Sequence, residues 1–468
     1  MLGRLVLMVA LGCSLASPAW AGRTADGREW PPDPAKYDKP GTPIGGGLAV
    51  GDVLAKENAE QAKDLLPPEI LKHYKMGDYS NPIVSWPTGI FYFDKSFEEA
   101  TKQNAGKYDL APEGAIVDKA TGKQPEYVYG LPFPDLKEGD PQAGLKAVWN
   151  SFYAWWNNGD GLFNSLLVWV SPGGKEREAY IDIRYQWYAA QAPKYRRPNP
   201  QNFLSQSLNL VTKPADLQGT AALMYRYLDP GKRDAAWTYV PALRRVRAIS
   251  PSNRSDGFLG SDLSQDDAQY FDAKPEDFQW KTIGLRAGLR IVDPESVRGL
   301  GGENKYQPDT NGFRTIWDKE VPAARYLQPG WDGKGLAWAP VSAALAKRKF
   351  WVVEGVPKDR YYLYGRIELW IDAESFEGAW NRKFSWKGEL LNTYQVTAYL
   401  NHPTQRPGDP DVEWFWSSSH AWNCAENMML DRATLTGLRA SLTAPLDRRV
   451  KHDIEQTFDL QALSRGGK

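Results

Sequence analysis

Hydrophobic and polar residues alternate with a period of two over many short stretches after residue 160, as in Arg366-Ile-Glu-Leu-Trp-Ile. Such alternation predicts β-strands with one buried face, and turns such as Asp229-Pro-Gly and Lys387-Gly favour antiparallel neighbours. We therefore expect at least nine antiparallel strands in one continuous sheet. The expected strands are 164–170, 178–188, 221–228, 236–239, 246–249, 350–353, 361–371, 383–386, 390–400 and 413–416.

Helical spacing is clearest over 144–158, where Trp149, Phe152, Tyr153 and Trp156 form one apolar stripe. We expect this helix to pack against the sheet, with Trp149, Phe152, Trp156 and Phe258 buried. Two shorter helices are expected to meet at Pro67-Pro68, and another lies around 97–103.

The pattern divides the chain into an arm and a sheet domain. Residues 22–130 are predicted to form an extended N-terminal arm with helices, and residues 131–468 the curved-sheet domain. Within that domain, residues 292–345 are rich in Gly, Pro and Trp and lack periodicity. Long loops of this kind are often functional, so this one is a candidate lid.

The segment from Trp237 to Trp280 carries the most specific motif of the chain. A strand-like Trp-Thr-Tyr breaks at Pro241, and Asp256-Gly-Phe-Leu-Gly-Ser-Asp262 follows after a basic turn. Next comes Ser264-Gln-Asp-Asp267, which predicts a capping box at the start of a short helix.

This segment resembles the LolA/LolB-like superfamily of outer-membrane lipoprotein-sorting proteins. Its nearer resemblance is to a bacterial periplasmic family of unknown function within that superfamily. Further segments that match this family are Gly130-Leu-Pro-Phe-Pro and the expected strand pair formed by 366–372 and 386–388. The resemblance implies a mainly β, α+β fold: a large antiparallel sheet curved into a half-barrel, with helices packed on the concave face. The signature residues it implies are structural: Trp237, Pro241, Asp256, Phe258, Gly260, Asp262, Ser264 and Asp267.

The N-terminus has the pattern of a secretory signal peptide over residues 1–21. Arg4 gives a positive region, residues 5–15 are apolar, and Ala19-Trp-Ala21 fits a cleavage site. We expect a soluble periplasmic protein that begins at Gly22. An alternative uses Cys13 as a lipidated cysteine, but the position three residues before it holds no large aliphatic residue.

Composition excludes some partners. The formal net charge is zero, which argues against nucleic acid. The basic run Arg244, Arg245 and Arg247 is interpreted as a solvated turn face. Only Cys424 remains after the predicted cleavage, so no intramolecular disulfide is expected. The chain has 20 Trp, 23 Tyr and 16 Phe, enough rings both to pack a sheet and to line a cavity.

Catalytic motifs are lacking. His420 and Cys424 stand four residues apart, but two ligands do not make a zinc site, and the sequence has no His-Glu-x-x-His, Cys-x-x-Cys or Gly-x-Ser-x-Gly motif. Asp262, Asp266 and Asp267 could supply a pair of catalytic acids, although capping also explains them. We expect no metal and no cofactor.

Two functions remain open. The first is a non-enzymatic carrier of a hydrophobic, lipid-like molecule that works with a membrane transporter or outer-membrane protein. Its candidate wall residues are Tyr185, Trp187, Tyr225, Tyr239, Leu369 and Ile371. The alternative is a glycan-binding or glycan-acting protein with aromatic platforms and an Asp pair. Rings inside the sheet among aliphatic residues favour the lipid, whereas rings on an exposed groove beside carboxylates favour the sugar.

Overall fold

The structure is a computed structural model that describes residues 22–23, 29–30, 38–86, 95–155, 160–191, 193, 196–294, 305–309, 312–316, 324–400, 418–437, 443–444 and 454–465. The predicted signal peptide, Cys13, Trp156 and the predicted strand 413–416 lie outside these residues.

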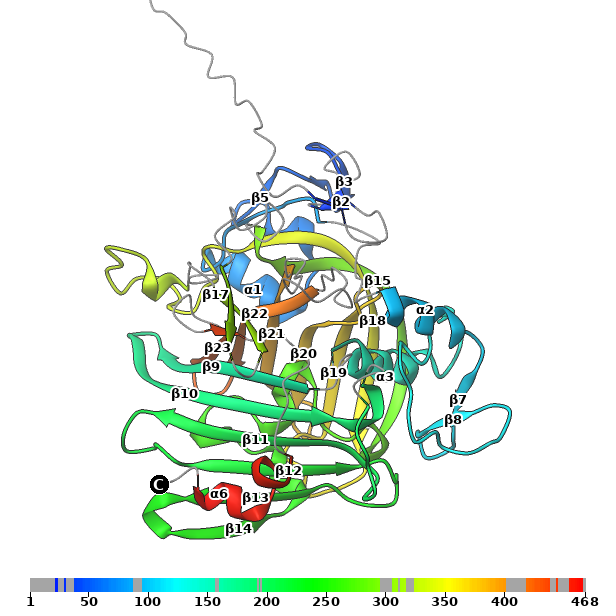
Figure 1. Ribbon diagram of the computed structural model, residues 1–468. Helices are drawn as coiled ribbons and strands as arrows, with labels where there is room; N and C mark the ends of the chain where they lie inside the picture. Colours follow the sequence, from blue (N-terminus) through cyan, green and yellow to red (C-terminus); the bar gives the residue numbers. More distant parts are fainter. Residues whose placement is uncertain are drawn as a thin grey trace, which may run out of the picture.

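A single curved sheet organises the described part of the chain and contains thirteen strands (Figure 1). In spatial order these are β14 (Arg245–Ile249), β13 (Ala235–Val240), β12 (Ala221–Tyr227), β11 (Phe203–Lys213), β10 (Gly174–Trp187), β9 (Asp160–Ser171), β23 (Arg432–Gly437), β22 (Ser418–Asn427), β21 (Leu390–Leu400), β15 (Phe278–Val292), β18 (Ala344–Pro357), β19 (Arg366–Asp372) and β20 (Gly378–Phe384). The prediction of one large antiparallel sheet is confirmed.

One pairing in this sheet is parallel. β15 meets β21 through the single pair Val292 and Ala398, and β21 also pairs with β20. Strands β15, β18, β19, β20 and β21 therefore close on themselves, while β9 to β14 extend away as an open, curved wing.

Small elements surround the sheet. The helices are α1 (Pro68–Met76), α2 (Lys95–Gln103), α3 (Ala143–Trp155), α5 (Ile454–Thr457) and α6 (Leu460–Arg465). The short strands are β1 (Gly22–Arg23), β2 (Glu29–Trp30), β3 (Pro43–Gly45), β4 (Leu48–Ala49), β5 (Val53–Leu54), β6 (Asn81–Pro82), β7 (Tyr108–Leu110), β8 (Ile116–Asp118), β16 (Lys305–Asp309), β17 (Gly312–Ile316) and β24 (Thr443–Ala444). Helix α1 begins at Pro68, as the diproline predicted, but a short 3-10 turn at Ala59–Ala62 takes the place of the expected second helix.

The inner face of the sheet, defined as the face that shares one hydrophobic cluster with α3, holds the main core. Side chains of alternating strand residues such as Ile181 and Leu369 meet Trp149, Phe152 and Tyr153 of α3 there. The predicted helix is thus confirmed in place and in its buried face, although it ends at Trp155 within the described residues.

Three other segments pack against the opposite, outer face. Helix α1 contributes Ile70 and Tyr74 to a cluster with Phe350 and Trp380, and α6 packs on β12, β13 and β14. One described part of the predicted long loop, residues 324–343, places Trp338 against β9, β22 and β23. Within the same predicted loop, the described strands β16 and β17 pair antiparallel, although its sequence lacks the periodicity of strands.

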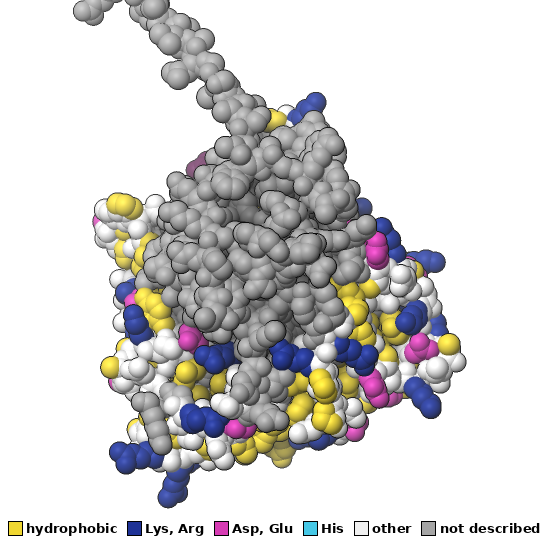
Figure 2. All heavy atoms as spheres, in the orientation of Figure 1, with side chains coloured by type: hydrophobic (Ala, Val, Ile, Leu, Met, Phe, Trp, Pro, Cys, Tyr) yellow, Lys and Arg dark blue, Asp and Glu magenta, His cyan; other side chains and the backbone are white. Residues whose placement is uncertain are grey.

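Charge is spread over the surface that Figure 2 shows. Around the undescribed residues, Lys and Arg side chains are interspersed with hydrophobic and acidic ones. The basic run behaves as predicted: Arg244, Arg245 and Arg247 are exposed at the β13–β14 hairpin. Among the described residues, no helix is both long and apolar enough to span a membrane.

Candidate functional site

Aromatic rings of α3 and of the signature segment cover the inner face of the sheet. The ring centroids of Phe152 and Tyr153 lie 6.1 and 6.2 Å from that of Trp187, and Phe152 lies 6.1 Å from Phe271. Aromatic pairs at these separations add to the stabilisation that burial provides. The result is a continuous apolar layer between helix and sheet.

Four of the six predicted wall residues lie in this layer. Tyr185 and Trp187 come from β10, and Leu369 and Ile371 come from β19. Their exposures are 3, 0, 0 and 0 %, respectively. The structure therefore brings together residues that are almost two hundred positions apart in the sequence, as a common wall requires.

Tyr225 and Tyr239 lie on the other side of the sheet. Both belong to the outer cluster that contains Phe458 and Leu463 near the C-terminus, and the Tyr225 hydroxyl donates a hydrogen bond to the carbonyl oxygen of Phe458. The six residues therefore do not form one wall. In β12 and β13, Tyr225 and Tyr239 face outward, and the residues that alternate with them face inward.

The signature segment crosses the inner side as a series of 3-10 turns. Phe258 was expected to be buried, and this was wrong: it is only half-buried, whereas Leu263 is 7 % exposed and enters the core. The chain reverses direction between these two residues, and the turn is closed by a hydrogen bond that the Phe258 N–H donates to the carbonyl oxygen of Leu263. Gly257 is required there, since a Cβ would lie 2.1 Å from the carbonyl oxygen of Ser261.

The remaining signature residues have separate places. The ring of Trp237 meets that of Tyr225 edge to face on the outer face, with their centroids 5.0 Å apart, and Pro241 begins the exposed turn after β13. Asp256 is exposed, and Gly260 adopts a positive φ of 72° that favours glycine.

The predicted capping box is confirmed at Ser264. The Asp267 carboxylate accepts hydrogen bonds from the Ser264 N–H at 2.7 Å and from the Ser264 hydroxyl at 2.9 Å. It also pairs with Lys383 of β20 at 2.5 Å, and both side chains are 2 % exposed.

Each of the three candidate acids is paired with a cation. Asp262 contacts Arg432 at 3.0 Å, Asp266 contacts Arg254, and Asp267 contacts Lys383. Asp262 accepts further hydrogen bonds from Asn427 and Thr434. A glycosidase needs two carboxyl groups that can reach a substrate, so these buried and paired acids are better explained as structural.

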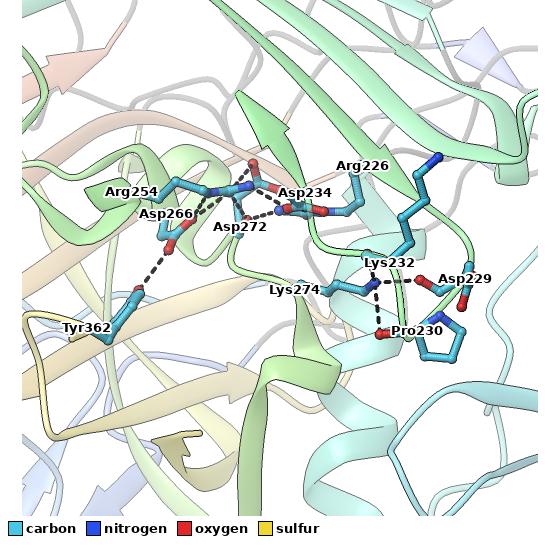
Figure 3. A network of polar contacts seen from close by, with 10 residues as sticks. All are labelled: Arg226, Asp229, Pro230, Lys232, Asp234, Arg254, Asp266, Asp272, Lys274 and Tyr362. Carbon is cyan, nitrogen blue, oxygen red and sulfur yellow. Dashed lines mark hydrogen bonds and ion pairs between the residues drawn. The ribbon is translucent and has the colours of Figure 1, made fainter. Parts of the chain in front are cut away.

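A network of buried charges, which the sequence did not predict, lies at one edge of the inner face (Figure 3). Arg226 of β12 contacts Asp234 at 3.0 Å and Asp272 at 2.8 Å. Arg254 contacts Asp234 and Asp266, and Asp266 accepts a hydrogen bond from the Tyr362 hydroxyl at 2.8 Å. Both guanidinium groups are at most 3 % exposed.

Burial and pairing oppose each other in this network. Burial alone would raise the pKa of Asp234, but Arg226 and Arg254 outweigh it and hold that pKa below its ordinary value. At Asp272 burial prevails, so its pKa is raised. Nearby Glu276 is 5 % exposed, and burial raises its pKa to about 7.

A small cleft of about 80 Å³ opens beside the network. Its wall includes Asp234, Lys274, Asp277, Phe278 and Tyr362. The rings of Phe278 and Tyr362 belong also to the inner-face core, so the cleft adjoins the aromatic layer.

The other candidate chemistry is not supported. Cys424 lies on strand β22, is 3 % exposed, and burial raises the pKa of its thiol, so it is not poised as a nucleophile. His420 occupies the same strand rather than a helix. The described residues contain no group of three or more His, Cys, Asp or Glu side chains that could hold a metal ion.

Comparison with known proteins identifies the family. A model of the family described as "Protein of unknown function (DUF1329)" matches residues 53–464. The chain belongs to the DUF1329 family. The match covers the sheet, the signature segment and the region from α1 onward, and it confirms the family that the signature resembles. No match was found among curated proteins.

Several solved structures resemble this one at low sequence identity. A DUF1329 family protein from Desulfovibrio piger is 16% identical, with a TM-score of 0.43, over 69% of this chain and 98% of its own. A candidate outer membrane lipoprotein-sorting protein domain from Vibrio parahaemolyticus is 15% identical, with a TM-score of 0.40, over 67% and 97%. A LolA superfamily protein from Nitrosomonas europaea is 11% identical, with a TM-score of 0.36, over 66% and 96%.

Proposed function

We propose that this protein is a non-enzymatic periplasmic carrier of a hydrophobic, lipid-like molecule. One observation carries the proposal: the rings of the inner face lie among aliphatic side chains under α3, as a lipid-binding face requires. The acids that a glycan-acting enzyme would use are instead buried in ion pairs.

The ligand site in this proposal is the inner face beneath α3. Each methylene group transferred from water to such a face is worth about 0.8 kcal/mol, so a long alkyl chain binds without any catalytic group. Rings of α3 now occupy the face, and the ligand would take their place when α3 moves away from β10.

The polar contacts of α3 suggest which end of the helix stays in place. The Gly144 N–H donates to the Thr282 hydroxyl at 2.8 Å, and the Trp149 indole N–H donates to the carbonyl oxygen of Gly114. Gly144 also packs tightly on β18, since a Cβ would lie 2.8 Å from Val353 Cγ1. In the proposal the N-terminal end of α3 therefore remains fixed, and the end near Trp155 opens.

The compartment and the partners belong to the same proposal. The signal-peptide pattern favours export to the periplasm, where a lipid needs a protein to cross the aqueous space. The carrier would receive or deliver its ligand at a membrane transporter or an outer-membrane protein.

The proposal is tested with protein purified from the periplasm without detergent. We expect lipid to be extracted from it and identified by mass spectrometry, and an environment-sensitive apolar dye to bind and be displaced by envelope lipid. Two matched variants locate the site: Ile183→Asp on the inner face of β10 and Leu210→Asp on the outer face of β11. Both side chains are half-buried, and each packs at the margin of its own cluster.

The charged residue should abolish dye binding at position 183 and spare it at position 210, because an unpaired charge is costly only where the ligand packs. Circular dichroism confirms that both variants are folded. Absence of lipid and dye from the wild-type protein, or equal binding by the two variants, would contradict the carrier and leave a protein that binds partners through its surface.

A further inference from the structure

Two carboxylates that line the cleft beside the buried charges keep acceptor atoms to which no described residue donates a hydrogen bond. Asp234 is 7 % exposed and lines the cleft, and its Oδ1 atom has no hydrogen-bond partner among the described residues. Asp277 also lines the cleft, and no described residue donates a hydrogen bond to its half-buried carboxylate. Burial first, and then the charge of Asp234, raise the pKa of Asp277.

The cations around the cleft already have partners: Arg254 pairs with the other carboxylate oxygen of Asp234 and with Asp266, and the rest contact other groups. The Lys274 ammonium donates to the carbonyl oxygens of Asp229, Pro230 and Lys232, which uses its three protons. Lys358 donates to the carbonyl oxygen of Glu276, and Arg233 pairs with Asp359 at 2.7 Å. Figure 3 shows Lys274 directed toward the 229–232 turn rather than toward Asp234.

Two aromatic rings also line the cleft. Phe278 and Tyr362 line the cleft and also pack in the inner-face core, where their ring centroids are 5.5 Å apart. An aromatic wall beside unpaired carboxylate oxygens suits a group that is positively charged and donates hydrogen bonds. The volume of about 80 Å³ admits a head group and not a whole lipid.

We propose that this cleft binds the primary ammonium group of an amphipathic amine, whose N–H bonds are accepted by Asp234 and Asp277. The inference rests on the proposed carrier function for one part only: the apolar chain of the ligand would continue along the inner face beneath α3. The ammonium group could belong to a lipid head group or to a free amine, and the experiment separates these sources.

The test compares probes that share a chain but differ at the head. Dodecylamine and dodecanol are each titrated against the bound apolar dye, and ethylamine is titrated separately while backbone amide resonances near the cleft are followed by NMR. For the wild-type protein we expect dodecylamine to displace the dye at least about tenfold more tightly than dodecanol, the usual strength of one charge-assisted hydrogen bond.

Asp277→Asn is the diagnostic variant, because its side chain has no structural partner to lose. It should bring dodecylamine to the affinity of dodecanol and leave dodecanol unchanged. Asp216→Asn, at an exposed turn, is the matched control and should behave as wild type.

The outcomes separate the two proposals. Equal binding of dodecylamine and dodecanol by the wild-type protein overturns the ammonium site while the carrier stands. If neither long-chain probe displaces the dye, the proposed binding of an alkyl chain, and with it the carrier function, is contradicted. The ethylamine titration alone then tests the ammonium site. Ethylamine-induced shifts of the amide resonances that occur in the wild-type protein and are abolished by Asp277→Asn then support a site for free amines. Absence of these shifts in the wild-type protein overturns the ammonium site.

Discussion

Replacing Lys383 by Met should destabilise the protein by about 3–5 kcal/mol, because it leaves Asp267 as a buried charge without a counter-ion. The Lys383 and Asp267 side chains are each 2 % exposed, and their charged atoms lie 2.5 Å apart. Methionine keeps most of the volume of the lysine stem, so a packing defect contributes little. Urea unfolding followed by tryptophan fluorescence measures the loss.

A double-variant cycle separates the ion pair from other losses. Asp267→Asn alone also removes the charged partner, and the two substitutions together should cost clearly less than the sum of the single effects. Ser264→Ala should cost only about 1 kcal/mol, because it removes a capping contact and leaves the ion pair intact. Additive effects of Lys383→Met and Asp267→Asn would refute the reasoning. Loss of ligand binding in Ser264→Ala at unchanged stability would instead favour catalytic carboxylates.

Three further changes test packing and buried charges. Gly144→Ala should lower stability by about 1 kcal/mol, since the clash with Val353 outweighs the gain in helix propensity; higher stability in urea would contradict it. Burial raises the pKa of Glu276 from 4.5 to about 7, so folding stability should fall as pH rises across that interval. Glu276→Gln should remove this slope and be more stable at pH 8 by up to about 3 kcal/mol, as urea midpoints at several pH values would show. Although burial opposes protonation of His73, its contact with Glu426 at 2.8 Å prevails and raises the His73 pKa. The stability from this pair should be present below pH 6.5 and be lost as pH rises through the raised pKa, and NMR titration should show a lower His73 pKa in Glu426→Gln.

Much of the sheet could be predicted from the sequence because its strands alternate plainly. Strands β10, β12, β13 and β19 and helix α3 follow the apolar period closely. Strand β15 was missed because Gly284 and Gly288 interrupt its pattern and its N-terminal half is mostly only half-buried, without a clear buried face. Strand β11 was missed because three consecutive polar residues, Ser205, Gln206 and Ser207, interrupt its alternation, and Gln206 occupies a buried position.

The candidate site was predicted only in part, for a different reason. Alternation tells which residues share a face, but a strand alone does not tell which face turns inward. Hence Tyr185 and Leu369 lie together in the inner-face cluster, whereas Tyr225, which was assigned to the same wall, lies on the outer face. The buried pair of Arg226 and Asp272 joins residues 46 positions apart, and no local pattern marks an arginine that is fully buried.

The three acids of the signature explain how the segment between β14 and β15 is held in place. Asp262 pairs with Arg432 of β23, Asp267 pairs with Lys383 of β20, and Asp266 with Arg254 joins the cluster around Arg226 of β12. These strands lie far apart in the sheet order, so the pairs connect its open wing to its closed part. Breaking any one of these ion pairs would leave a buried charge without a partner, at a high cost in free energy. The pairs therefore hold the segment in one position. Because the charges gather along this segment, the rest of the inner face can remain apolar, as the binding of an alkyl chain would require.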